Sequence, residues 1–62
     1  MLVDTYEKDN RKAEIHDTNN QFEVKLYHDD ILIEIIPLKD KSIYYAISCA
    51  ENYVERIGTF YQ

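Results

Sequence analysis

Residues 11–37 read RKAEIHDTNNQFEVKLYHDDILIEIIP, and this stretch decides the fold. Apolar and polar side chains alternate along it, which is the period-two pattern of β-strands. The pattern holds in three segments: 11–17, 21–28 and 31–37. Asn19-Asn20 and Asp29-Asp30 separate these segments, and both residue types tolerate the positive φ angles of a two-residue hairpin turn. The stretch therefore predicts an antiparallel meander.

Opposite charges select the register between neighbouring strands. With a loop at residues 19–20, Glu14 lies opposite Lys25, whereas moving the loop by one residue would oppose two glutamates. Like charges directly opposite each other are unfavourable, so we expect the first register. A second loop at residues 29–30 then places Glu34 opposite Lys25 and predicts a row of alternating charge on the outer face. In that register the inner face carries Ile31, Ile33 and Ile35, and the outer face carries Leu32, Glu34 and Ile36.

Two further elements flank the meander. The segment 2–6 is a candidate fourth strand, although one of its faces must accept Asp4 or lose Leu2 and Tyr6. From residue 41 the apolar residues recur at helical spacing, which predicts a helix over 41–57 with one apolar stripe. The stripe consists of Ile43, Ala46, Ile47, Ala50, Val54 and Ile57.

The ends of the helix carry their own signals. Asp40 or Ser42 can cap its N-terminus, and Gly58 stands where a C-cap belongs. We therefore expect one α+β domain over residues 1–62: an antiparallel β-meander of three to four strands with one C-terminal helix packed on one face.

Composition excludes several classes of protein. The chain has 62 residues, near the lower size limit for independent folding. Seven Lys and Arg residues are scattered among twelve Asp and Glu residues, and this net charge of −5 disfavours direct binding of nucleic acid. No apolar run approaches the roughly 20 residues of a membrane-spanning helix. The single cysteine and the missing basic secretion signal lead us to expect a cytoplasmic protein.

Residue types that act in catalysis or bind metals do not form a recognisable motif. His16 and His28 lie at opposite ends of the first predicted hairpin, so they do not converge on a metal. Cys49 falls mid-helix with no histidine close in sequence, which favours a half-buried structural thiol over a nucleophile. Glu51 and Glu55 lie one turn apart on the solvent side of the helix. The sequence therefore predicts no enzyme, no cofactor and no metal site.

Six tyrosines in so short a chain provide candidate contact residues. Tyr and Arg are enriched where proteins bind one another most tightly, whereas isolated apolar residues on a surface are also normal, and both interpretations stay open. The candidate partner-binding residues fall on two surfaces: Tyr45, Asn52 and Arg56 on the helix, and Tyr27, Leu32 and Ile36 on the outer face of the sheet. The tail 59–62 is apolar enough to dock elsewhere on the domain.

The stretch 42–58 resembles the C-terminal part of small uncharacterised proteins of marine tailed phages. Those chains show a β-meander followed by a helix with the pattern Tyr-Ala, three variable residues, Ala-Glu-Asn, an aromatic residue and Val. The matching residues here are Tyr45-Ala46 and Ala50-Glu51-Asn52-Tyr53-Val54. The segments 2–6 and 59–62 depart from that pattern. The resemblance implies a phage-encoded accessory protein and carries over no catalytic residues.

These observations favour a small, acidic, non-enzymatic protein-binding module, a phage-encoded modulator of a host protein in the host cytoplasm. The alternative is a homo-oligomeric structural or accessory protein, for instance a homodimer, with no separate partner. We expect neither direct nucleic-acid binding nor membrane insertion. A nucleic-acid mimic would need clustered acidic residues, whereas Lys25 interrupts the predicted row between Glu14 and Glu34.

Overall fold

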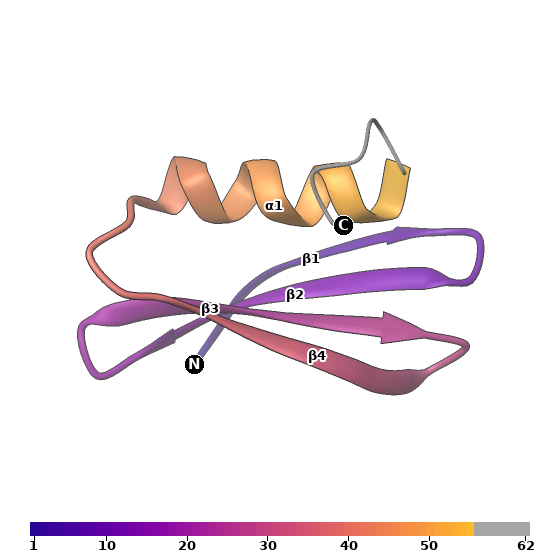
Figure 1. Ribbon diagram of the computed structural model, residues 1–62, viewed down its shortest axis with the longest axis horizontal. Helices are drawn as coiled ribbons and strands as arrows, with labels where there is room; N and C mark the ends of the chain where they lie inside the picture. The colour runs from indigo at the N-terminus through magenta and orange to yellow at the C-terminus, as the bar shows by residue number, and fades with distance from the viewer. Residues whose placement is uncertain (56–62) are drawn as a thin grey trace.

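Four antiparallel strands and one helix make up residues 1–55, the part of the chain that the computed structural model describes (Figure 1). The strands form one sheet in the order β1-β2-β3-β4, and α1 packs on one of its faces. The elements are β1 (Leu2–Lys8), β2 (Arg11–Thr18), β3 (Gln21–His28), β4 (Ile31–Leu38) and α1 (Ile43–Glu55). The predicted α+β meander is confirmed, and the segment 2–6 belongs to a fourth strand.

The hairpin turns are built from Asn and Asp in the left-handed region. Asn19 and Asn20 have φ angles of 49° and 66°, and Asp29 and Asp30 have φ angles of 53° and 67°. Two consecutive positive φ angles define a type I′ turn, whose twist matches that of the flanking strands. The turns therefore fix the two hairpin loops where the sequence predicts them.

The register between β2 and β3 is the predicted one. Glu14 lies opposite Lys25, Ile15 opposite Val24 and His16 opposite Glu23. The side chains of Ala13, Ile15, Val24 and Leu26 consequently all point to the face that α1 covers, and all four are fully buried.

The predicted register between β3 and β4 is wrong beyond the turn. Leu32 pairs with Tyr27, but the next pairs are Leu26 with Glu34 and Lys25 with Ile35, so Ile33 is an extra residue in a β-bulge. A shift of one residue exchanges the two faces of a strand.

The exchange corrects two expectations. Ile36 pairs with Val24 and packs against the core instead of lying on the outer face, and Ile35 lies on the outer face in its place. Glu34 likewise does not extend the charge row of Glu14 and Lys25. The strand also continues through Pro37 to Leu38, which is buried.

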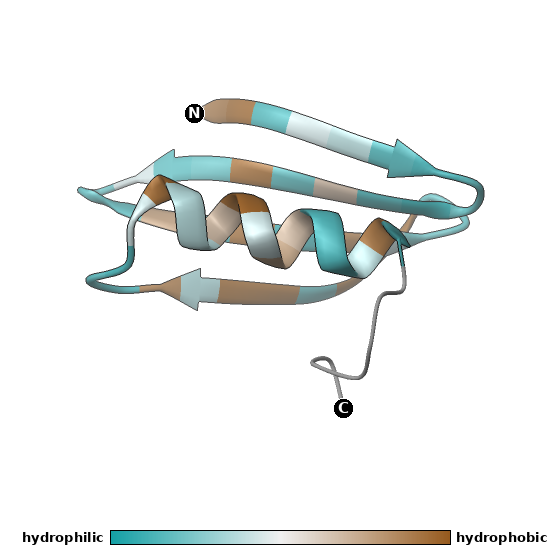
Figure 2. Cartoon of the chain, turned by 90° about the horizontal axis from the view of Figure 1, so that it is seen from above, coloured by the Kyte–Doolittle hydropathy of each residue, from teal (hydrophilic) through white to brown (hydrophobic). Residues whose placement is uncertain are grey.

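The core lies between α1 and the strands β2 and β3. It contains Ala13, Ile15, Val24, Leu26 and Leu38 from the sheet and Ala46, Ala50, Tyr53 and Val54 from the helix. Figure 2 shows α1 lying across the middle of the sheet, with β4 beyond its cover. The helix packs chiefly against β2 and then against β3 and β1.

Side chains bond to the backbone near both ends of the described part of α1. The hydroxyl of Ser42 accepts the backbone N–H of Tyr45 at 3.3 Å, so Ser42 is the N-cap and the helix begins at Ile43, two residues later than predicted. In the last turn the guanidinium of Arg11 donates to the backbone carbonyl of Tyr53 at 3.0 Å. The predicted positions of Ile57 and Gly58, and the tail 59–62, lie outside the described residues.

Replacing Asn20 by Val should lower the free energy of unfolding by about 1–2 kcal/mol, because a β-branched residue does not fit a φ of 66°. Asn20→Gly is the matched control and should stay within about 0.5 kcal/mol of the wild type. Urea unfolding monitored by circular dichroism measures both values. Equal stability of the two variants would contradict the turn assignment.

Candidate partner-binding surface

Strand β4 exposes an unusual amount of apolar surface. The exposed fractions are 66% for Ile31, 44% for Leu32, 52% for Ile33 and 45% for Ile35. These four residues are called the β4 apolar edge below. They are exposed because, among residues 1–55, α1 packs over β1 to β3 and leaves most of β4 outside its cover (Figure 2). Large exposed apolar patches mark sites where proteins bind other molecules.

The backbone of β4 offers a second kind of contact. Among residues 1–55 the sheet ends at β4, because no described strand pairs with its far side. An edge strand presents N–H and C=O groups that another strand can pair with, and natural proteins usually protect such an edge with charges, bulges or proline. Here the protection consists of the bulge at Ile33, the single charge of Glu34 and Pro37.

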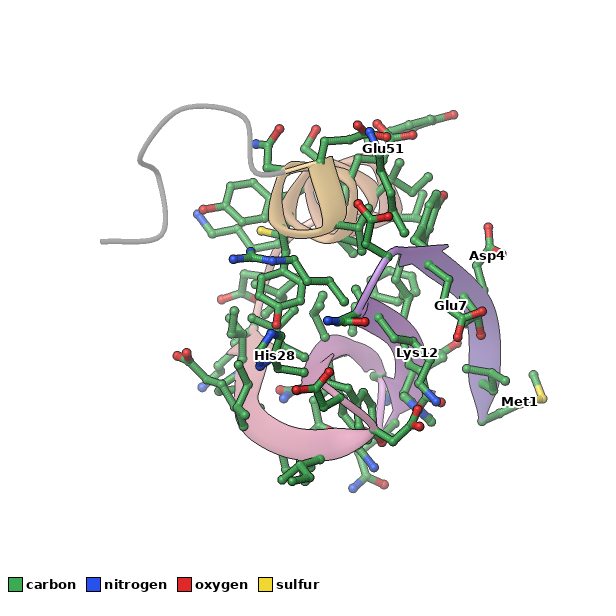
Figure 3. The ribbon with its side chains drawn as sticks, turned by 90° about the vertical axis from the view of Figure 1, so that its right-hand side faces the viewer. Met1, Asp4, Glu7, Lys12, His28 and Glu51 are labelled. Carbon is green, nitrogen blue, oxygen red and sulfur yellow. The ribbon has the colours of Figure 1, made fainter. Side chains whose placement is uncertain are left out.

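Helix α1 has two different flanks beside its buried stripe. One flank faces β1: Lys8 of β1 forms an ion pair with Glu55 at 2.8 Å, and desolvation, then Asp4 and lastly the charge of Glu51 raise the pKa of Tyr6. Figure 3 shows Glu51 on the β1 side, with β4 curving away on the other side. Tyr45, Cys49 and Asn52 follow at spacings of four and three on the opposite flank, which therefore lies toward β4. These three residues are called the Tyr45 flank below.

The structure separates the six predicted contact residues. Tyr45 is 48% exposed and shares the Tyr45 flank with the half-buried Asn52. The ammonium group of Lys41 lies 5.0 Å from the centre of the Tyr45 ring. Leu32 is exposed on β4, but Ile36 packs against the core and is not available as an outer contact. Arg56 lies outside the described residues.

Tyr27 is half-buried and is held within a polar cluster on the face of the sheet opposite α1. Its hydroxyl donates to Glu14 at 3.2 Å, and the same carboxylate lies 2.9 Å from Nε2 of His16. Lys12 lies 3.9 Å from Glu14 and 4.6 Å from the centre of the Tyr27 ring. Desolvation and then the bond to Glu14 raise the pKa of Tyr27, so its hydroxyl stays protonated. Tyr27 thus orders this cluster, and its ring is less accessible than that of Tyr45.

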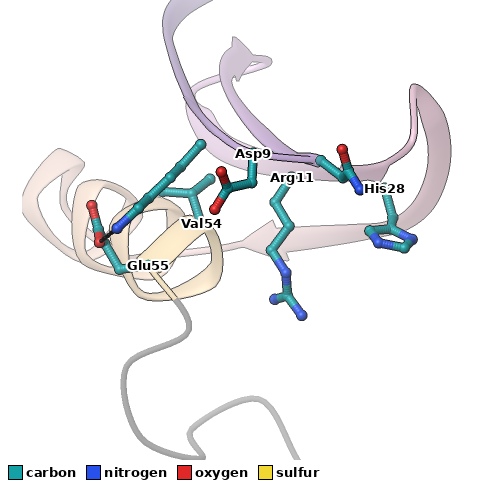
Figure 4. A pocket seen from close by; sticks show the side chains of 7 residues that line it. Asp9, Arg11, His28, Val54 and Glu55 are labelled. Atoms are coloured by element: carbon teal, nitrogen blue, oxygen red, sulfur yellow. Dashed lines mark hydrogen bonds and ion pairs between the residues drawn. The ribbon is translucent and has the colours of Figure 1, made fainter.

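A hollow lies at the end of the sheet near the described end of α1. It has a volume of about 290 Å³ and is lined by residues that include Lys8, Arg11, His28 and Glu55 (Figure 4). The lysine and the arginine in its lining, Lys8 and Arg11, both have partners within the chain. Lys8 pairs with Glu55 (Figure 4), and Arg11 stacks on the Tyr53 ring at 4.9 Å while bonding its carbonyl. These contacts hold the end of the helix against the strands beside the β1–β2 turn.

The remaining candidate catalytic and metal-binding residues do not form a site within residues 1–55. Burial raises the pKa of the Cys49 thiol, which disfavours the reactive thiolate, and the side chain is half-buried against the core as the sequence predicts. Within residues 1–55, no three His, Cys, Asp or Glu side chains converge as a metal site would require. The same residues contain no helix with the length and apolar character needed to cross a bilayer.

Comparison with protein-family models, with curated proteins and with solved structures found no match to this chain. The functional argument therefore rests on the residues themselves. Sequence reasoning missed Ile33 and Ile35 as exposed residues, because an unbroken apolar segment such as 31–33 carries no information about which face is buried.

The Glu14 cluster should make the stability depend on pH. The bond to His16, and to a lesser degree those to Tyr27 and Lys12, hold the pKa of Glu14 below its ordinary value near 4.5 despite partial burial. A depressed carboxyl pKa stabilises the fold above the unfolded pKa, and this contribution is lost as the pH falls through the folded pKa. Compared with Glu14→Gln, the wild type should therefore lose stability more steeply below about pH 4.5.

Urea unfolding at several pH values between about 6 and 3 measures this difference. Tyr27→Phe is the intermediate control, because it removes one of the bonds to the carboxylate and keeps the larger contribution of His16. Parallel stability curves for the wild type and Glu14→Gln would show that the carboxylate is not stabilised by these contacts.

Proposed function

We propose that this chain is a non-enzymatic protein-binding module, and that its partner contacts the Tyr45 flank of α1 together with the neighbouring β4 strand. The observation that carries the proposal is the apolar surface on this side of the domain. Residues 1–55 bury nine side chains in the core and leave nine large apolar side chains exposed, four of them on β4. A domain with so small a core gains stability from burying such a surface against a partner.

The chemistry of the surface suits a protein ligand. Tyrosine combines a large apolar ring with a hydroxyl and loses little conformational entropy on binding, so it is enriched in the centre of protein interfaces. Tyr45 supplies such a ring, and Asn52 adds an amide two helical turns further along the same flank. The ammonium group of Lys41 lies over the Tyr45 ring. The net charge of −5 favours partners with a basic rim.

The partner class follows from the resemblance of the stretch 42–58 to phage accessory proteins. A small phage protein without catalytic groups acts by occupying a surface of a host protein, and the single thiol fits a reducing cytoplasm. We accordingly propose a bacterial host protein as the ligand of the Tyr45 flank and the host cytoplasm as the place of action.

Tyr45→Ala should reduce capture of the partner from a bacterial lysate by about tenfold or more, the loss typical of a tyrosine at the centre of an interface. Tyr44→Ala is the matched control. Tyr44 is the adjacent residue, is 76% exposed, and lies on the flank that faces away from β4, so its removal should leave capture unchanged. Quantitative mass spectrometry of the proteins retained by each immobilised variant measures the effect.

Both variants change an exposed side chain, and circular dichroism should show that both remain folded. Equal capture by Tyr45→Ala and the wild type would overturn the assignment of the Tyr45 flank. Equal loss in both tyrosine variants would point to the helix surface as a whole instead of to the flank beside β4.

A further inference from the structure

We propose that two copies of this chain pair antiparallel through their β4 strands, so that two four-stranded sheets join into one continuous sheet. This inference rests on the proposed function, because it assigns an occupant to the β4 part of the same surface. It adds a symmetric architecture in which the Tyr45 flanks of the two helices face each other.

The alternation of backbone bonds indicates which groups of β4 have no partner strand among residues 1–55. Thr18 and Gln21 close a two-residue turn and are therefore a hydrogen-bonded pair, so the residues of β3 that bond to β2 are Gln21 and every second residue after it. The intervening residue Val24 bonds toward β4, to its partner Ile36. Ile35 and Pro37 must then direct their backbone groups away from β3, and Pro37, which has no N–H, costs the existing sheet no bond.

A two-fold axis at Ile35 satisfies this pattern. It pairs Ile35 with Ile35 of the second copy through two backbone hydrogen bonds, and it places Glu34 opposite Ile36. An axis at Glu34 would instead set the two carboxylates directly opposite each other, which is unfavourable, and would pair residues whose backbone groups already point to β3. The single charge of β4 therefore selects the register.

The ends of the strand are complementary in charge in this register. An antiparallel arrangement about Ile35 brings the turn Asp29-Asp30 of one copy beside the segment 39–41 of the other copy. That segment reads Lys-Asp-Lys, so a doubly negative turn meets a segment with an excess of one positive charge at each end of the interface. A chain with a net charge of −5 thus avoids repulsion at the place where two copies meet.

Pairing also determines how the two helices are arranged. Residues directly opposite each other in an antiparallel pair share a face, so both helices lie on the same face of the joined sheet. The Tyr45 flank of each helix lies toward β4, so the two flanks face each other across the two β4 strands. The backbone edge of β4 is covered in the seam while its side chains stay on the two faces of the sheet, and a partner entering between the helices would touch both tyrosines.

Sedimentation velocity and native mass spectrometry of the full chain test the pairing. The wild type should change from the 7.4 kDa monomer to twice that mass at about 10–100 μM, the range expected for a small interface. Ile35→Lys places two ammonium groups opposite each other and should abolish the dimer. Val3→Lys is the matched control, because Val3 is a β-branched residue with the same 45% exposure on the other edge strand, and it should still dimerise.

A mixture of two variants tests the register itself. Ile35→Lys and Ile35→Glu should each be monomeric, whereas their equimolar mixture should form a heterodimer, since the axis then opposes Lys to Glu. Amide exchange and circular dichroism check that each variant is folded. Recovery of a dimer only in the mixture supports the axis at Ile35.

Three outcomes would overturn the pairing. One is a wild type that stays monomeric up to about 1 mM, far above the expected range. Another is a dimer that survives Ile35→Lys, which would place the interface elsewhere. The third is a monomer destabilised by Ile35→Lys and not by Val3→Lys, which would mean that Ile35 contributes to the fold of the single chain and not to an interface. In each case, selective capture by the Tyr45 flank would remain a separate result, so a failure of the pairing can be distinguished from a failure of the proposed function.

Discussion

The structure depends on how closely α1 approaches the strands β2 and β3. Three alanines are fully buried where the two layers meet, Ala13 on the sheet and Ala46 and Ala50 on the helix. Tyr53 fixes the far end of the contact, because its hydroxyl donates to the carbonyl of Tyr27 at 2.8 Å while Arg11 holds its own carbonyl. Small residues permit the approach, and the bonds of Tyr53 set the position of the helix along the strands.

This placement has a consequence at the edge of the sheet. A single helix covers the width of about two strands at a spacing of roughly 5 Å between strands and 10 Å across a helix. A helix seated over β2 and β3 therefore leaves β4 outside the core, although β4 is the most apolar strand of the chain. The β-bulge at Ile33 lets Ile36 and Leu38 still reach the core, while the β4 apolar edge remains exposed.

The two faces of the sheet consequently differ in the contacts that they make within the chain. The face under α1 holds the fold together, and the opposite face carries the polar cluster of Glu14, His16, Lys12 and Tyr27, whose partners are all within the chain. In both of our proposals, contacts with other molecules are made by the β4 apolar edge and the Tyr45 flank, which lie on the same side of the domain. Strand pairing and helix recognition can therefore operate together, since one uses the backbone of β4 and the other uses side chains of α1.

The sequence by itself determined the meander, the hairpin turns at residues 19–20 and 29–30, the register of Glu14 against Lys25 and the helical stripe. Each of these depends on local information: strict alternation, turn residues or a charge pair. It also placed Tyr45 and Asn52 on the helix surface. Only the tertiary structure decided the faces of β4, because Ile31-Leu32-Ile33 and Ile35-Ile36 are apolar in both possible registers, so the pattern cannot choose between them. Packing of Ile36 and Leu38 under the helix made that choice, and it turned Ile35 outward.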